Sequence, residues 1–376
     1  NTGEDKSKGD IYVARRDSSG AWGPARNLGA PLNTPGPNGV ISVSPDGQSL
    51  LLLNTYNADG SMGQGISSAI ALDTTWTTPK PLDIQLIRNN SSYGDYYLSA
   101  SGKELLVSIE GDDSYGGADL YVSFRQPSGA WGAPRNLGSR VNGAEDDFAP
   151  HLAADGVTLY FTSARPGGLG GWDIWVTRRL DDTWVNWSEP ANLGAPTNSA
   201  SDESYYSIAA SGREAYFAKV NPENQSDDIY RVALPPAARP RAVVLLSGRV
   251  LNAKTREPIE AQVVYSALPE GNELGFGLSS KTDGEYAVTL PAGAMYGILA
   301  EARGFLSESA SLDLSELADY QELRRDLLLV PVEKGERIRL NNIFFETGKA
   351  ELLEASNAEL DRVAAFLTRS PTLQIE

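Results

Sequence analysis

The sequence predicts a mostly-β protein whose first 232 residues form a β-propeller. Three observations point to that fold: a tight turn, a tryptophan and an aspartate-led strand start each recur about every 55 residues. That spacing is of the order of one propeller blade, which contains about four short strands. A single blade cannot bury both of its faces, so such repeats stack around a common axis.

The tight turn lies between two apolar runs. Its glycine tolerates the positive φ that a hairpin turn requires. Successive copies are 55, 54 and 56 residues apart, and an apolar strand follows each copy. The four copies are Ser44-Pro45-Asp46-Gly47, Ser99-Ala100-Ser101-Gly102, Ala153-Ala154-Asp155-Gly156 and Ala209-Ala210-Ser211-Gly212.

The other two markers keep the same period. We expect the tryptophans to pack between blades rather than to stack on a ligand; they are Trp22, Trp76, Trp131 and Trp187. An Asn-Leu-Gly segment follows three of them, starting at Asn27, Asn136 and Asn192. The strand starts are Asp10-Ile11-Tyr12, Asp119-Leu120-Tyr121, Asp173-Ile174-Trp175 and Asp228-Ile229-Tyr230.

Both terminal blades are predicted to be incomplete. Asp10 would begin a third strand, so the first blade lacks its two inner strands, and the last blade ends after its third strand at Arg231. We expect six blades in the whole propeller, with five as the alternative. The missing strands are expected upstream of Asn1, where an export signal or a lipid anchor could also lie.

These markers resemble the TolB-type, WD-like propeller repeat of bacterial envelope proteins. The resemblance covers residues 1–232 and implies the fold, but little about function, because propellers serve many roles. The third repeat contains most of the family pattern: Asp147, Pro150, Asp155-Gly156, Leu159-Tyr160-Phe161, Ser163, Gly170-Gly171 and Asp173-Ile174-Trp175.

A different β pattern follows the propeller. Residues 233–242 are a proline-rich linker by composition. Residues 243–332 resemble the carboxypeptidase-regulatory-like domain, a transthyretin-like β-sandwich that is structural or adhesive in its family. The matching segments are Gly248-Arg249-Val250, Thr255 to Ile259, Thr282 to Tyr286 and Ala302 to Phe305.

Residues 333–376 resemble the first part of an α/β OmpA-like peptidoglycan-binding domain. Residues 342–352 match its opening, residues 351–367 have apolar side chains at helical spacing, and residues 372–375 would begin another strand. The wall-binding Asp and Arg of that family would lie beyond Glu376. The resemblance therefore assigns only the rim of the peptide pocket here, and a plain strand-to-helix turn is the alternative; the rim residues are Glu346, Thr347 and Gly348.

The sequence offers few groups for catalysis. His151 is the only histidine, and it aligns with Ser42, Tyr97 and Ser207 of the other repeats, so it occupies an ordinary repeat position. No Gly-x-Ser-x-Gly segment is present, and the absence of cysteine excludes a thiol nucleophile. We therefore predict that the protein is not an enzyme, has no catalytic residues and needs no cofactor.

Acidic pairs recur in the predicted loops. We interpret them as solvated turns, with calcium binding as the alternative, and predict no metal site. Residues 167–171 are interpreted as a flexible turn before a strand rather than as a phosphate-binding loop. The acidic segments are Asp112-Asp113, Glu145-Asp146-Asp147, Asp202-Glu203 and Asp227-Asp228.

Charge and module order suggest partners. A net charge of −17 disfavours nucleic acid, and the chain has no apolar run long enough to span a membrane. The module order is similar to that of the PorE family of the type IX secretion system. This similarity implies a non-enzymatic periplasmic protein at the outer membrane, which anchors a secretion or gliding assembly to peptidoglycan and binds other envelope proteins through its propeller and sandwich. The alternative is a secreted or surface carbohydrate-binding propeller that uses the aromatic segments Tyr93 to Tyr97 and Tyr205-Tyr206.

Overall fold

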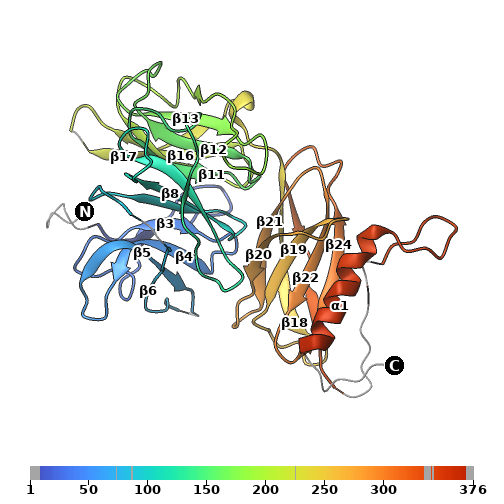
Figure 1. Cartoon of the computed structure of the whole chain (residues 1–376). Coiled ribbons are helices and arrows are strands. Elements are labelled where there is room, and N and C mark those ends of the chain that lie inside the picture. Colours follow the sequence, from blue (N-terminus) through green and yellow to red (C-terminus); the bar gives the residue numbers. More distant parts are fainter. Residues whose placement is uncertain are drawn as a thin grey trace. The chain divides into compact units, whose positions relative to one another are not determined.

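The computed structural model describes residues 9–72, 74–85, 88–224, 226–333, 340 and 343–369. The chain divides into two compact units, Asn1–Pro240 and Arg241–Glu376. Both are built largely from strands (Figure 1). The predicted mostly-β propeller fold is confirmed.

The first unit contains five small antiparallel sheets, numbered here as blades 1 to 5 in chain order. The first strands of blades 2 to 5 contact one another in sequence, which makes them the inner strands of the propeller. Blade 1 contains β1 (Tyr12–Val13) and β2 (Arg26–Asn27); blade 2 contains β3 (Val40–Val43), β4 (Ser49–Tyr56), β5 (Met62–Ile70) and β6 (Lys80–Pro81); blade 3 contains β7 (Asp95–Leu98), β8 (Glu104–Ile109), β9 (Asp119–Phe124) and β10 (Arg135–Asn136); blade 4 contains β11 (Asp147–Leu152), β12 (Thr158–Ser163), β13 (Asp173–Arg178) and β14 (Ala191–Asn192); blade 5 contains β15 (Glu203–Ile208), β16 (Glu214–Val220) and β17 (Asp227–Ala233).

Blade 1 contacts blade 5 through Trp22, which is 55% exposed. The Trp22 ring lies 6.3 Å from the Tyr216 ring on β16, edge to face. Arg16 adds an ion pair of 3.6 Å to Glu214. Trp131 and Trp187 occupy the same place against the preceding blade, in buried clusters that contain Leu51 and Leu106 respectively. The five sheets therefore follow one another around the axis, which matches the alternative of five blades rather than the expected six.

The asparagine of each Asn-Leu-Gly marker is hydrogen-bonded to a second asparagine, six residues later in the chain. In blade 3, Asn142 accepts the Leu120 N–H at 2.8 Å and donates to the Leu120 carbonyl at 2.9 Å, as a neighbouring strand would. It also donates to Asn136 Oδ1, which accepts the Gly138 N–H. The same set of contacts recurs at Asn33 in blade 1 and Asn198 in blade 4.

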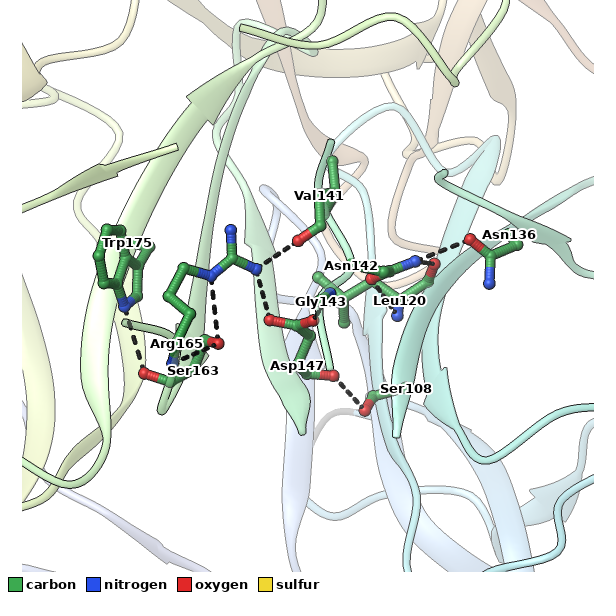
Figure 2. A network of polar contacts seen from close by, with 10 residues as sticks. All are labelled: Ser108, Leu120, Asn136, Val141, Asn142, Gly143, Asp147, Ser163, Arg165 and Trp175. Carbon is green, nitrogen blue, oxygen red and sulfur yellow. Dashed lines mark hydrogen bonds and ion pairs between the residues drawn. The ribbon is translucent and has the colours of Figure 1, made fainter. Parts of the chain in front are cut away.

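The loops between blades are tied down by carboxylates. Figure 2 shows Asp147, which is fully buried, accepting from Arg165 at 2.6 Å and from the Gly143 N–H at 2.7 Å. Its backbone carbonyl accepts from the Ser108 hydroxyl of blade 3 at 2.9 Å. Glu203 repeats this arrangement in blade 5, paired with Lys219 at 3.3 Å. Asp147 and Glu203 are therefore parts of the blade junctions, and the solvated-turn interpretation is wrong for them.

The glycine-rich turn before β13 is packed rather than open. A Cβ atom on Gly170 would collide with the backbone at Ser199 and Ser201, and one on Gly171 would collide with the Asp202 carboxylate. That carboxylate accepts the Trp172 N–H at 2.9 Å. The turn thus needs glycine because the loop of the next blade lies directly against it.

The tail of the propeller unit is also anchored. The short 3-10 helix η1 (Pro236–Ala238) lies in the proline-rich segment. The Tyr160 hydroxyl donates to the Ala238 carbonyl, and Arg178 donates to the carbonyls of Ala237 and Arg239. At least this part of the predicted linker is packed on blades 4 and 5.

The second unit contains a β-sandwich of two sheets around one buried core. Gly248 has no room for a side chain, because a Cβ atom there would meet the backbone of Arg325. The Tyr286 hydroxyl donates to the Arg325 carbonyl at 2.8 Å. The segments that contain Gly248 and Tyr286 therefore both pack against the backbone of Arg325. One sheet contains β18 (Val243–Asn252), β21 (Glu285–Pro291), β23 (Phe305–Leu306), β25 (Gln321–Arg324) and β26 (Leu327–Pro331); the other contains β19 (Gln262–Leu268), β20 (Glu273–Leu278), β22 (Met295–Glu301) and β24 (Glu308–Asp313).

The last described segment contains η2 (Glu354–Ser356) and α1 (Asn357–Arg369). The helix begins six residues later than residue 351, where the apolar spacing predicted it. The Glu359 carboxylate is buried and accepts from the Ser309 hydroxyl of β24 at 2.9 Å, so α1 is attached to the sandwich (Figure 1). The strand predicted at residues 372–375 lies outside the described residues. None of the helices in the described part of the chain has the length and apolar character of a membrane span.

Candidate functional site

One face of the propeller carries exposed aromatic side chains. We call it the inner-strand face: it is the side on which β7, β11 and β15 begin and β8, β12 and β16 end. Antiparallel pairing of Asp95 with Ser108, and of Asp147 with Ser163, places these strand ends on the same side. The aromatic side chains come from the loops and strand starts there, with exposed fractions of 83% for Tyr93, 56% for Tyr115, 43% for Trp172 and 59% for Tyr205.

Asp95 is the acidic group at the centre of this face. It is the first residue of β7, an inner strand, and its side chain is half-buried. Its Oδ2 accepts the Ala149 N–H of β11 at 3.3 Å, and the Tyr205 hydroxyl of β15 lies close enough to influence its pKa. Burial raises the pKa of the Asp95 carboxyl above its ordinary value, although the Ala149 N–H and the Tyr205 hydroxyl act in the opposite direction. One carboxyl group therefore interacts with residues of the inner strands of blades 4 and 5.

A backbone irregularity places Tyr205 beside Asp95. The β15–β16 register shifts by one residue between Ser204 and Ser207, so Tyr205 and Tyr206 together oppose Phe217 in a β-bulge. Tyr205 has φ +55°, a left-handed conformation that is uncommon for a bulky residue. Ala149 has φ +47° at the corresponding bulge of β11. Strained conformations of this kind occur preferentially at functional sites.

The surroundings of Tyr205 are acidic. Burial of the hydroxyl and the nearby charges of Asp95 and Asp227 raise the pKa of Tyr205 to about 12. Asp227 is exposed at the start of β17 in blade 5. Two carboxyl groups from different blades therefore act on one phenol, whose ring is exposed to solvent.

His151 lies two residues further along β11 than Ala149 and is buried. Its Nε2 accepts the Ile208 N–H of β15 at 3.3 Å, and its ring lies 4.6 Å from the Tyr97 ring of β7. Burial lowers the pKa of His151 to about 4. The structure thus places this histidine in contact with both strands that carry Asp95 and Tyr205.

A hollow of about 840 Å³ lies between the outer parts of blades 3 and 4. Its lining includes Tyr115 and Asp113 from the β8–β9 loop and Val185 from the β13–β14 loop. An exposed ion pair between Arg140 and Glu189 joins its two sides.

The other residues singled out by sequence lie elsewhere. Glu346, Thr347 and Gly348 form an exposed tight turn in the second unit, where the Lys349 N–H donates to the Glu346 carbonyl at 2.9 Å. Their role as the rim of a peptide pocket stays a prediction. Within the described residues, no group of three or more histidine, aspartate or glutamate side chains is arranged to hold a metal ion.

Comparison with known proteins finds no matching family model and no matching curated protein. Among solved structures, the chain is similar to an endo-arabinase from Bacteroides thetaiotaomicron (16% identity, 60% of this chain and 86% of that chain, TM-score 0.37). It is also similar to the Bacteroides ovatus xyloglucan PUL GH43B (12%, 81% and 84%, 0.36) and to a Penicillium chrysogenum α-L-arabinanase complexed with arabinobiose (14%, 78% and 85%, 0.33). Because these three TM-scores are below 0.5, we infer function only from the residues of this chain.

These findings correct the family expectations. The resemblances to a TolB-type propeller, a carboxypeptidase-regulatory-like domain, an OmpA-like domain and the PorE family are wrong: no family model matches the chain, and the similar solved structures named above are glycoside hydrolases. The same neighbours contradict the expectation that the protein is not an enzyme. The ordinary repeat position of His151 argues against a Ser-His-Asp hydrolase, but it does not bear on hydrolysis by carboxyl groups.

Proposed function

We propose that the propeller binds a carbohydrate on its inner-strand face, at Asp95 and Tyr205. The observation that supports this most is the proximity of the half-buried Asp95 carboxyl group to the hydroxyl of Tyr205, a tyrosine that is exposed to solvent. Aromatic rings cover the apolar C–H faces of sugars, while carboxyl and hydroxyl groups bond to sugar hydroxyls. Tyr93 and Trp172 offer further aromatic surface on the same face.

The test is binding of the full chain to a glycan array, followed by calorimetry with the tightest oligosaccharide. Tyr205→Ala removes both the stacking surface and the hydroxyl, so we expect the affinity to fall at least about tenfold. Tyr12→Ala is the matched control, because Tyr12 is also an exposed tyrosine, 49% exposed, but lies on an outer strand of blade 1. Equal affinities of Tyr205→Ala and the wild type would contradict this site, and an array without binding would contradict the function.

A second candidate function is hydrolysis of a glycosidic bond at the same site. The specific observation is that two carboxyl groups from different blades, Asp95 and Asp227, are near enough for their charges to act on Tyr205. Glycosidases use two carboxyl groups, and the general acid is the one whose pKa is raised, as that of Asp95 is. Asp95 would protonate the leaving oxygen, and Asp227 would act on the opposite side of the sugar ring.

Asp95→Asn separates binding from cleavage. The amide keeps the size of the side chain but cannot donate a proton as a carboxylic acid does, so we expect binding to persist while release of reducing sugar falls at least about 100-fold. The assay uses the oligosaccharides that bind on the array. Binding with no sugar release by the wild type would leave only the binding function, and full activity of Asp95→Asn would contradict Asp95 as the acid.

A further inference from the structure

His151 contacts both strands that hold the two site residues. On one side its Nε2 accepts from the Ile208 N–H of β15, three residues after Tyr205. On the other side its ring lies against Tyr97 of β7, two residues after Asp95. His151 is itself two residues after Ala149, whose N–H reaches Asp95. The three strands that meet at the carboxyl group of Asp95 therefore meet a second time at His151.

The residue at the same repeat position in blade 2 also accepts a hydrogen bond from a backbone N–H of the next inner strand. Ser42 in blade 2 pairs with Leu51 as His151 pairs with Tyr160, and the Ser42 hydroxyl accepts the Leu98 N–H of blade 3 at 3.3 Å. The position thus supplies a side-chain acceptor for a backbone N–H of the next inner strand. A serine reaches that N–H but offers no ring to the preceding strand.

The hydrogen bond also defines the state of the imidazole. Nε2 accepts from Ile208, so the proton of the neutral ring is on Nδ1. The ring is buried between Tyr97 and Tyr160, whose own ring lies 6.5 Å away, and burial keeps both phenols neutral by raising their pKa. A neutral, fully packed imidazole is well suited to hold two strands at a constant spacing.

We propose that His151 is a positioning residue that holds β7 and β15 at the separation required for the Asp95–Tyr205 contact. The proposal depends on the proposed carbohydrate site for its functional meaning, but the positioning itself is a property of the free protein. Removal of the acceptor and ring lets β15 move away from β7, which opens Asp95 to water and separates it from Tyr205.

The experiment compares His151→Ala with His151→Ser in the full chain. Two quantities are measured: the pKa of the Asp95 carboxyl by carbon NMR, with Asp95→Asn for assignment, and the affinity for the tightest array oligosaccharide. We expect His151→Ala to lower the Asp95 pKa toward its ordinary value and to weaken binding about tenfold. His151→Ser keeps an acceptor, as Ser42 does, so we expect it to restore most of both quantities.

Leu193→Ala is the control for a general loss of stability, because Leu193 is an apolar side chain buried in the core between blades 4 and 5. An unchanged Asp95 pKa in a folded His151→Ala variant, or an equal shift in Leu193→Ala, would overturn the positioning role. A shifted Asp95 pKa in a protein whose wild type binds no glycan would support positioning and contradict the proposed function. Should His151→Ala fail to fold, His151→Gln, which keeps an acceptor but has no ring, provides the same two measurements.

Discussion

Replacement of Arg165 by alanine is expected to lower the free energy of unfolding by about 3–5 kcal/mol, as loss of one partner from a buried ion pair does. Arg165 Nη2 contacts Asp147 at 2.6 Å and also donates to the Val141 carbonyl. The guanidinium lies 4.6 Å from the centre of the Phe161 ring, which adds a cation–π contact. The variant leaves the Asp147 carboxylate fully buried between blades 3 and 4 with its cation removed.

The protonation of Asp147 offers a second measurement on the same variant. Burial already raises the pKa of Asp147, and the charge of Arg165 partly opposes this. Without Arg165 the pKa rises further, so the folded variant takes up a proton that the unfolded chain binds only at lower pH. The stability lost in Arg165→Ala is therefore expected to shrink as pH falls toward the ordinary pKa of aspartate. Urea unfolding at neutral and at acid pH measures both effects.

Arg140→Ala is the matched control. Arg140 pairs with Glu189, but the two side chains are 58% and 77% exposed, so we expect a loss below about 1 kcal/mol. A double variant that replaces Arg165 with Met and Asp147 with Leu removes both charges and should recover much of the loss. Equal effects of Arg165→Ala and Arg140→Ala would show that the Asp147 carboxylate does not depend on its buried partner.

The repeat was predictable because its markers act locally. The glycine of each turn adopts a positive φ, as at Gly47 and Gly156, and the requirement is visible in any single copy. The tryptophans were expected between blades, and Trp131 and Trp187 are buried there. The count of blades was not predictable in this way, because it depends on the contact of Trp22 with Tyr216 across the ring.

The carboxylates show where local patterns fail. Asp146 and Asp147 are neighbours in an acidic run, yet only Asp147 is buried, since its partner Arg165 lies 18 residues away on the next loop. An acidic run predicts solvent-exposed side chains unless the basic residue that pairs with it is known from the structure.

The candidate site could be predicted only in part. The aromatic segments at Tyr93 to Tyr97 and Tyr205-Tyr206 were visible as candidates for carbohydrate binding. Their meeting was not, because Asp95 and Tyr205 are 110 residues apart in the chain and come together only through the bulge in β15. The family resemblances instead placed the candidate site at residues 346–348, and no family model matches that segment.

The contribution of His151 to the stability of the propeller is expected to decrease as pH falls from about 6.5 to about 4. The pKa of His151 is about 4 in the folded protein and about 6.5 in an unfolded chain. Between these values the unfolded chain binds a proton that the folded protein does not, so acid favours unfolding. The stability present above pH 6.5 is thus lost progressively, by about 3 kcal/mol in total.

Comparison of wild type with His151→Ser isolates this contribution from that of the carboxyl groups. Serine occupies the same repeat position at Ser42 and does not titrate, so the variant should lose about 3 kcal/mol less than the wild type across this pH range. At neutral pH the variant is expected to be the less stable protein, because a smaller side chain leaves a gap beside Tyr97. The two curves of unfolding free energy against pH should therefore converge toward pH 4, and parallel curves would show that His151 does not remain neutral in the folded protein. Since the imidazole contacts Tyr97 of β7 and the Ile208 N–H of β15, its protonation would loosen the junction of the blades that carry Asp95 and Tyr205.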